Sequence, residues 1–417
     1  MSAVAPAQRP AAQPLTPQAA WVMVLALCAG VALSQAFRTV GAIMASPLQA
    51  DFHLSAQALG IFSGAFHFAF GAMQLFMGIG IDLHGVRRTV LVAFPVAIAG
   101  ALLSAVSPNY LVLVAGQALI GVGCAPAFLV CTVFIARHFP AARFATVSGL
   151  VLAIGGLGML ATGTPLAWLV QAYSWRAGFL VLALASALAW LAIWRWVHEP
   201  ASAVPQKKES IPEAVRQFGA LFAMPHTLGI MVLGAVTYAA FISLRGLWLG
   251  PLMMERHGYS LVQSGNVALA VSVIALFGSP LFGRFDRDGA ARRRWIVACG
   301  LLYAGLFALI AVVHSAWLDI AGMVLIGVLS GFSVWQYADV RVAYPAALTG
   351  RAMAVFTMAM FLGVAFMQWG TGVAASVAAA HGGDPLTAVL AVIAALLVIG
   401  IAAFAWLPAP KAVPVRS

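Results

Sequence analysis

The segments GIGIDLHGVRR at 78–88 and GRFDRDGAARRR at 283–294 share one pattern, in which a glycine and an aspartate precede a cluster of arginines. Each segment lies between two long apolar runs, where the chain would leave one helix and enter the next. The spacing from Gly78 to Gly283 recurs, within three residues, between other landmarks of the two halves. These landmarks are Arg38 and Arg245, Asp82 and Asp286, and Pro140 and Pro345. The chain is therefore predicted to contain two copies of one structural unit.

The composition around these segments predicts a membrane protein. Of the 417 residues, 63% are hydrophobic and only 8% are charged, with a mean hydropathy of +1.00. Soluble proteins are about 45–50% apolar and about 25% charged, so a soluble core could not hide this much apolar surface. The composition excludes soluble enzymes, nucleic-acid-binding proteins and disulfide-stapled secreted domains. No enzymatic motif is found, and the sequence predicts no cofactor and no resident metal.

Twelve apolar runs are long enough to cross a bilayer, because a spanning helix needs about 20 apolar residues. The predicted fold is an all-α polytopic membrane protein with two six-helix pseudo-repeat bundles. Its predicted parts are a disordered tail at 1–20, a first bundle at 21–197, a cytoplasmic linker at 198–225, a second bundle at 226–408 and a tail at 409–417.

The positions of the basic residues predict the orientation. Eighteen of the 22 lysines and arginines fall on the side that carries both termini, and only Arg176 and Arg256 fall on the opposite side. Cytoplasmic loops carry such an excess. We therefore expect a multi-pass protein of the inner (plasma) membrane with both termini in the cytoplasm. This placement of the basic residues explains the net charge of +11, so no nucleic-acid partner is expected. We expect the protein to be embedded in the lipid bilayer as a monomer.

The segment at 78–88 resembles the loop signature of the major facilitator superfamily, Gly-x3-Asp-x2-Gly followed by basic residues. The matching residues are Gly78, Asp82, Gly85, Arg87 and Arg88, whereas Leu83 replaces a basic residue. The resemblance implies two parallel halves around a central cavity and transport by alternating access.

This signature also suggests a gate on the cytoplasmic side. An aspartate between two helices can cap a helix N-terminus and pair with nearby arginines. The predicted gating residues are Asp82, Arg87, Arg88, Asp286 and Arg292. The alternative is that Arg87 and Arg88 only anchor the loop to anionic lipid headgroups.

The predicted membrane interior contains three ionisable side chains, Arg38, His67 and Arg245, while all eleven acids fall in loops or near helix ends. An arginine at mid-helix costs about 2.5–3.5 kcal/mol on insertion, so it normally faces a water-filled cavity. Two guanidiniums without a carboxylate predict an anionic substrate held by bidentate hydrogen bonds. The alternative is that each arginine reaches the interface or bonds backbone carbonyls of a neighbouring helix.

Helix 1 carries a second resemblance. The stretch FRTVGAIMASP at 37–47 is similar to the organic-phosphate and organic-anion exchangers of the superfamily, which carry a further arginine on helix 7. The resemblance implies an anion carrier with Arg38 and Arg245 as ligands. The basic helix-5 residue of phosphate-ester carriers is absent, which favours small carboxylates.

Other candidate contacts follow from spacing and from the family. Ser34 and Tyr238 share the helix faces of the two arginines, and the family lines its cavity with helices 4 and 10. The additional candidates are Ser34, Tyr238, Gln117, Trp335 and Gln336. His67 is either a packing residue or the carrier of a coupled proton.

The predicted function is secondary active transport of a small organic anion, with a proton or a counter-anion as the coupled ion. One alternative is a copper importer that uses Met73, Met77 and His67, since thioethers suit Cu(I). Another is a multidrug exporter, which is weakened because Gln117 stands where such exporters usually carry an arginine.

Overall fold

The computed structural model describes residues 16–140, 143–198, 219, 221–285 and 289–409. All regular elements in these ranges are helical, and twelve segments among them are long and apolar enough to cross a membrane. These findings confirm the predicted all-α membrane fold. Most of the predicted linker at 198–225 lies outside the described residues.

The first six spans are formed by eight helices. The second and third spans are parts of one long helix, and the first, fourth and fifth spans are each followed or completed by a shorter helix. The helices are α1 (Pro17–Thr39), α2 (Gly41–Phe52), α3 (Ala56–Ala105), α4 (Tyr110–Cys124), α5 (Ala127–His138), α6 (Phe144–Ala161), α7 (Thr164–Ala172) and α8 (Trp175–Trp196).

The last six spans are formed by the remaining elements, with two π-helical turns in the seventh span. These elements are α10 (Thr227–Ser243), η2 (Leu244–Trp248), α11 (Leu249–Pro251), η3 (Leu252–Arg256), α12 (Leu261–Gly283), α13 (Gly289–Val312), α14 (Ala316–Leu329), η4 (Ser330–Phe332), α15 (Ser333–Ala343), α16 (Ala346–Ala380) and α17 (Pro385–Trp406).

The signature at 78–88 lies inside α3, where the backbone is helical except at one glycine. Gly85 has φ 80° and ψ 170°, a conformation that residues with a side chain rarely adopt. The break lies near the start of the span 83–105, beyond the end of the span 56–74. Asp286 and the side chain of Asp82 lie outside what the structure describes, so their predicted gating role stays a prediction.

The other predicted gating residues lie at the same end of the molecule. Arg87 donates a hydrogen bond to the carbonyl of Trp194 in α8, 3.1 Å away, within the first half. Arg88 is exposed, and Arg292 is buried in α13. These positions leave both the gating hypothesis and the headgroup-anchoring hypothesis open.

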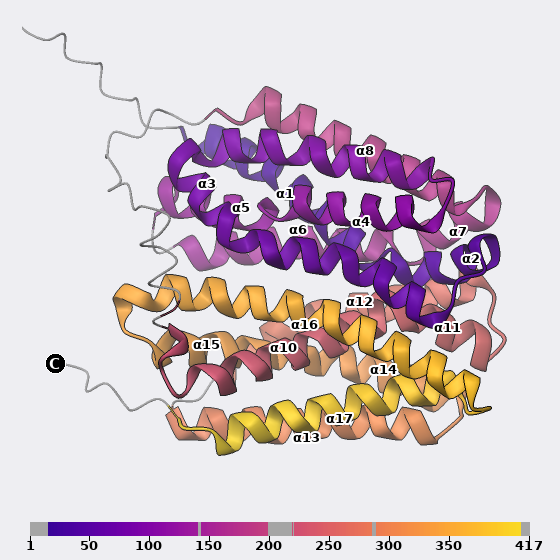
Figure 1. Ribbon diagram of the computed structural model, residues 1–417. Helices are drawn as coiled ribbons and strands as arrows, with labels where there is room; N and C mark the ends of the chain where they lie inside the picture. The colour runs from indigo at the N-terminus through magenta and orange to yellow at the C-terminus, as the bar shows by residue number, and fades with distance from the viewer. Residues whose placement is uncertain (1–15, 141–142, 199–218, 220, 286–288, 410–417) are drawn as a thin grey trace, which may run out of the picture.

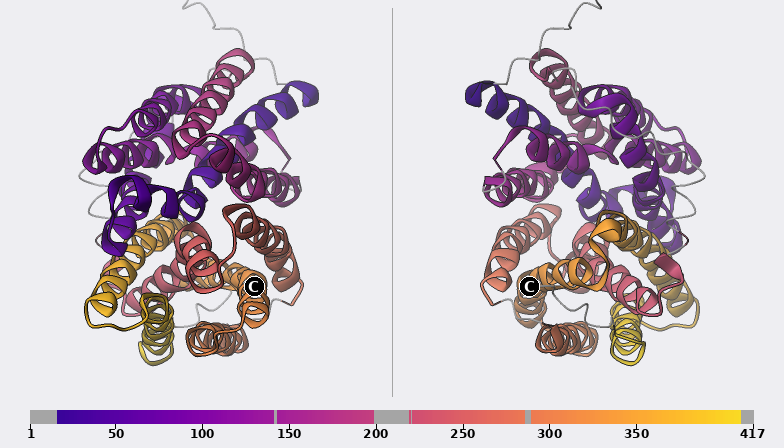
Figure 2. Two further views of the ribbon diagram at one scale, coloured as in Figure 1. Left: turned by 90° about the vertical axis from the view of Figure 1, so that its right-hand side faces the viewer. Right: turned by 90° about the vertical axis from the view of Figure 1, so that its left-hand side faces the viewer.

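The two sets of six spans pack as two bundles, as the ribbon and the end-on views show (Figures 1 and 2). The bundles touch at the end where α2, α7 and α11 lie together (Figure 1). There the backbone N–H of Gln57 donates to the Ser376 hydroxyl at 3.0 Å, and the Thr164 hydroxyl donates to the side-chain oxygen of Asn266 at 2.6 Å. We call this the closed end. Because α2 continues α1 into this end, α1 begins at the opposite end, where α17 also ends (Figure 1).

Glycines allow the backbones to meet at the closed end. A Cβ atom on Gly250 would collide with the carbonyl oxygen of Ala42 in the other half, and one on Gly60 would collide with that of Gln368. Small residues at such contacts let helices approach within van der Waals distance in a membrane.

A leucine at Gly250 is expected to wedge the closed end apart, because the backbone of Ala42 cannot move aside without moving its helix. Spin labels introduced through Gln57→Cys and Ser376→Cys would report a longer distance in Gly250→Leu than in the parent protein. The matched control is Gly305→Leu, because nothing lies within 4 Å of a Cβ at Gly305. An unchanged label distance in Gly250→Leu would contradict this account of the closure.

An ion network with a buried centre and one exposed carboxylate, Asp384, links three elements of the second half at the same end. Arg256 pairs with Asp384 at 2.9 Å and lies 3.7 Å from Asp319, and His257 bonds Asp319 at 2.7 Å. Burial alone would raise the pKa of Asp384, but hydrogen bonds from Thr387, the backbone and Arg256 lower it to about 2. The network therefore contains ionised groups at neutral pH and ties η3 to α14 and α17.

We expect Asp319→Asn to lower the thermal unfolding midpoint of the purified protein clearly. The Asp319 side chain is fully buried, and removing one partner of a buried ion pair costs about 3–5 kcal/mol. The matched control is Asp51→Asn, because Asp51 and its partner Arg176 are 46% and 42% exposed, and exposed pairs contribute about 0–1 kcal/mol. Equal shifts in the two variants would show that the network adds no stability.

Candidate functional site

A cavity of about 510 Å³ lies between the two bundles. Because the contacts described above seal the closed end, this cavity opens toward the opposite end, where α1 begins and α17 ends (Figure 1). Both halves contribute to its walls. The lining residues are Val31, Gln35, Arg38, Phe70, Gln74, Ala125, Phe128, Leu129, Thr132 and Leu152 from the first half, and Tyr238, Tyr337, Met353, Ala354, Thr357, Met360 and Phe361 from the second.

Arg38 is the charged group of this cavity, at the end of α1. One terminal nitrogen bonds Gln35 at 2.8 Å and the Tyr238 hydroxyl at 3.4 Å, and the other bonds the Ser34 hydroxyl at 3.1 Å. The structure thus brings together three residues predicted from the sequence: Arg38, Ser34 and Tyr238. Gln35 adds a contact that the sequence analysis missed.

Two neighbouring aromatic rings pack against the Arg38 guanidinium. The guanidinium carbon lies 4.6 Å from the ring centre of Phe70 in α3 and 4.6 Å from that of Phe361 in α16. Each cation–π contact contributes about 0.5–2 kcal/mol, depending on how far the pair is removed from water. Among the described residues, no carboxylate pairs with Arg38. The rings therefore stabilise a cation that pairs with no acid in the described part of the chain.

Arg245 lies elsewhere, fully buried in η2 and away from the cavity lining. Its Nε donates to the Ser272 hydroxyl at 2.7 Å and to the carbonyl of Ala268 at 3.1 Å, both in α12. Its Nη2 donates to the carbonyl of Met159 in α6, 2.9 Å away in the other half. In this conformation Arg245 therefore follows the alternative interpretation, in which an interior arginine bonds backbone carbonyls. The two arginines do not meet across one chamber here.

The environments of the two arginines are related by the internal repeat. Arg38, on the first span, contacts the second span of its own half and the eleventh span of the other. Arg245, on the seventh span, contacts the eighth span and the fifth span. The repeat thus predicts where each arginine points, but one meets aromatic rings beside a cavity and the other meets carbonyls. At Arg245, α6 and α12 pack directly together, with Gly156 against Leu276, and supply the carbonyls of Met159 and Ala268.

His67 is buried in α3 and does not line the cavity. Its Nδ1 lies 3.1 Å from the carbonyl oxygen of Ser63, and its Nε2 has no hydrogen-bond partner among the described residues. The ring lies edge-on to Phe66 and stacks at 6.3 Å from Phe361, the ring that also covers Arg38. The histidine is thus a neighbour of the site through a shared aromatic residue.

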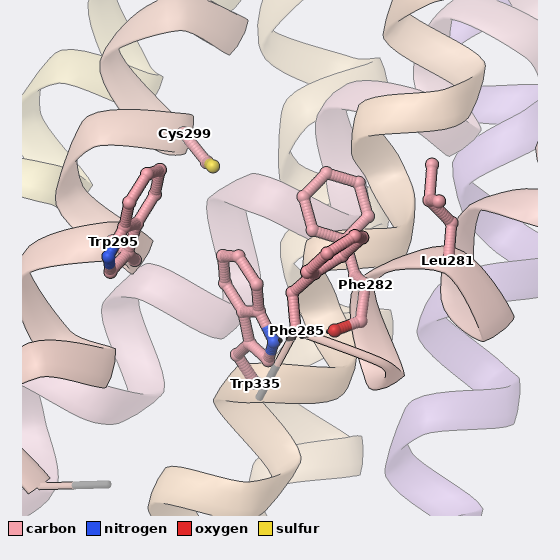
Figure 3. A pocket seen from close by; sticks show the side chains of 6 residues that line it. All are labelled: Leu281, Phe282, Phe285, Trp295, Cys299 and Trp335. Carbon is pink, nitrogen blue, oxygen red and sulfur yellow. Dashed lines mark hydrogen bonds between the residues drawn. The ribbon is translucent and has the colours of Figure 1, made fainter. Parts of the chain in front are cut away.

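The remaining candidates lie away from the cavity in this conformation. Gln117 is buried within the first half, and Gln336 accepts a hydrogen bond from Thr237 at 3.0 Å within the second half. Trp335 donates to the carbonyl of Phe282 at 2.9 Å and lines a separate, mainly apolar pocket with Phe285, Trp295 and Cys299 (Figure 3). None of these three side chains lines the cavity.

A scan against protein families matches residues 26–368 to the Major Facilitator Superfamily. The chain is 25% identical over 255 residues to the "Uncharacterized transporter YybO" of Bacillus subtilis (strain 168), covering 57% of this chain and 58% of that protein, which is less than two thirds of its length. It is 22% identical over 372 residues to the "Probable galactarate/D-glucarate transporter GudP" of the same organism, covering 81% of each.

Solved structures of the same fold cover nearly the whole chain. A bacterial homologue of the human lysosomal transporter Spinster, in an inward-facing and occupied conformation, matches with a TM-score of 0.74 at 17% identity over 94% of this chain and 97% of that one. A D-xylose–proton symporter matches with a TM-score of 0.70 at 16% identity over 94% and 98%. With a family match over most of its length, the protein belongs to the Major Facilitator Superfamily, as its loop signature predicted, and is a membrane transporter.

Proposed function

We propose that this transporter carries a small organic anion, a carboxylate, by alternating access and that Arg38 is its principal ligand. The main observation in support is that the guanidinium of Arg38 lines the cavity between the bundles and pairs with no carboxylate among the described residues. A carboxylate can take the place of Gln35 and Tyr238 at Arg38 and accept a shorter, charge-assisted hydrogen bond. Ser34 then keeps its hydrogen bond with the other terminal nitrogen and positions the guanidinium.

The comparisons support an anion without naming it. One relative carries the name of a probable galactarate/D-glucarate transporter, and both of these compounds are carboxylates. With both termini in the cytoplasm of a bacterial-type inner membrane, as the basic residues predict, the cavity would face the cytoplasm. A monomer suffices for this mechanism, because the cavity lies within one chain.

The positive charge of Arg38 also explains how closure of the cavity would be coupled to anion binding. Closing the cavity around an empty site would strip water from Arg38 without replacing it, and an uncompensated charge in a membrane interior is costly. A bound anion offsets that cost, so the loaded carrier closes more readily than the empty one. This favours exchange, or symport with a proton, over leak.

No specific observation favours copper import or multidrug export. In the described part of the chain, no group of three metal-binding His, Cys, Asp or Glu side chains occurs, and Met73 and Met77 pack against the core without lining the cavity. We therefore do not propose copper import or multidrug export.

A ligand screen tests the proposed anion. Thermal unfolding of the purified protein would be followed with carboxylates, phosphate esters, neutral sugars and metal ions, because a ligand that binds the folded state raises the unfolding midpoint. We expect carboxylates to stabilise wild-type protein and to lose this effect in Arg38→Gln. Stabilisation by metal ions or neutral sugars alone would overturn the proposal.

His67 provides a separate test of proton coupling. If its imidazole carries the coupled proton, His67→Gln should retain anion exchange but lose the dependence of net uptake on pH, because an amide does not titrate near neutrality. Uptake into proteoliposomes with and without a pH gradient measures both reactions. A pH dependence equal to that of wild type would leave His67 as a packing residue, consistent with its position between Phe66 and Phe361.

A further inference from the structure

The charge of the cavity lining is sufficient to neutralise one carboxylate of a substrate. Among its lining residues in the described part of the chain, Arg38 is the one charged side chain. The polar remainder consists of amides and hydroxyls, such as those of Gln74, Tyr337 and Thr357. These groups can hydrogen-bond a substrate but cannot neutralise a second negative charge.

Arg245 does not supply the missing charge. It is fully buried outside the lining, and its Nε and Nη2 donate to Ser272, Ala268 and Met159. Reaching a substrate in the cavity would require the guanidinium to break hydrogen bonds to both bundles. A second carboxylate in this conformation would therefore lose its hydration without gaining a cation.

The walls around Arg38 are mainly aromatic and aliphatic. Phe70 and Phe361 lie side by side against the guanidinium, and Phe128, Met353 and Met360 also line the cavity. Such walls favour a substrate with an apolar body, because burying it removes apolar surface from water. Aromatic substrates gain further from offset or edge-to-face contacts with these rings. A charged or heavily hydrated group facing the same walls would be left unpaired.

Resting on the anion transport proposed above, we infer that the substrate is a monocarboxylate with an apolar body of about one aromatic ring. The carboxylate binds the edge of the Arg38 guanidinium, and the ring lies among Phe70, Phe361 and the methionines. A cavity of about 510 Å³ accommodates a molecule of this size together with water. This selectivity differs from the sugar diacids in the name of one relative.

Matched acid pairs test the inference on the purified full-length protein. Binding of benzoate and terephthalate, and of gluconate and glucarate, would be measured by calorimetry. We expect benzoate to bind at least ten times more tightly than terephthalate and more tightly than gluconate. Terephthalate or glucarate binding as tightly as its one-carboxylate partner, with binding still lost in Arg38→Gln, would overturn the monocarboxylate inference and leave anion transport standing. Binding of none of the four, or binding unaffected by Arg38→Gln, would overturn the proposed function itself.

A second variant tests whether the number of charges sets the selectivity. Gln74 lines the cavity one helical turn beyond Phe70, and its amide donates to the carbonyl of Ala125 at 3.2 Å. Gln74→Lys adds a cation there, so we expect the terephthalate-to-benzoate affinity ratio to rise at least tenfold. Gln74→Met is the matched control without charge and should keep the wild-type ratio. An unchanged ratio in a folded Gln74→Lys protein would contradict the inference.

Discussion

Replacing Arg38 with glutamine is expected to abolish anion-dependent stabilisation and transport, and replacing it with lysine to weaken both by about ten- to a hundredfold. A hydrogen bond to a charged group contributes about 1.5–3 kcal/mol, and an ammonium cannot reproduce the planar fork of a guanidinium. Lysine also loses the contact of the guanidinium with Phe70 and Phe361, whose ring centres lie 4.6 Å from the guanidinium carbon. Calorimetry and uptake into proteoliposomes measure the two effects.

The control for this experiment is Arg195, which is exposed at the end of α8. Arg195→Gln and Arg195→Lys alter the net charge by the same amounts as the Arg38 variants but lie far from the cavity lining. They should therefore retain both binding and uptake. Wild-type transport by Arg38→Lys would contradict the proposed ligand, because the bidentate geometry would then be dispensable.

The fold could be predicted from the sequence because its causes are local. Spanning segments are set by apolar length, and several start at a residue whose side chain caps the helix, such as Ser55, Asn109 and Ser174. The loop signature was also informative, since Gly85 has the positive φ that favours glycine. The family match then agreed with the motif-based resemblance.

The site was predicted only in part, because it depends on contacts between distant segments. Ser34 shares a helix face with Arg38, so spacing alone identified it, and the same reasoning could have found Gln35. Phe361 comes from the other half of the chain, and no local pattern indicates that its ring covers Arg38. The sequence also could not show that α6 and α12 would pack together and give Arg245 carbonyl partners.

Replacing Arg245 with methionine is expected to reduce anion exchange by about ten- to a hundredfold while anion affinity changes little. In this conformation Arg245 joins the bundles through the Met159 carbonyl, 2.9 Å away. A hydrogen bond from a charged donor contributes about 1.5–3 kcal/mol, and its loss shifts the equilibrium between conformations by the corresponding factor. Spin labels at Gln57→Cys and Ser376→Cys should report a larger open population at the closed end.

Ser272→Ala separates this role from simple packing. The Ser272 hydroxyl accepts from Arg245 within the second half, so its removal leaves the bond between the bundles intact. This variant should therefore exchange anions at close to the wild-type rate and keep the wild-type label distance. If Arg245→Met instead lost anion binding as completely as Arg38→Gln, Arg245 would be a second ligand in another conformation, as the sequence alone predicted. The cavity would then bind two carboxylates at some stage of the cycle, and substrate selectivity would be set by both halves of the repeat.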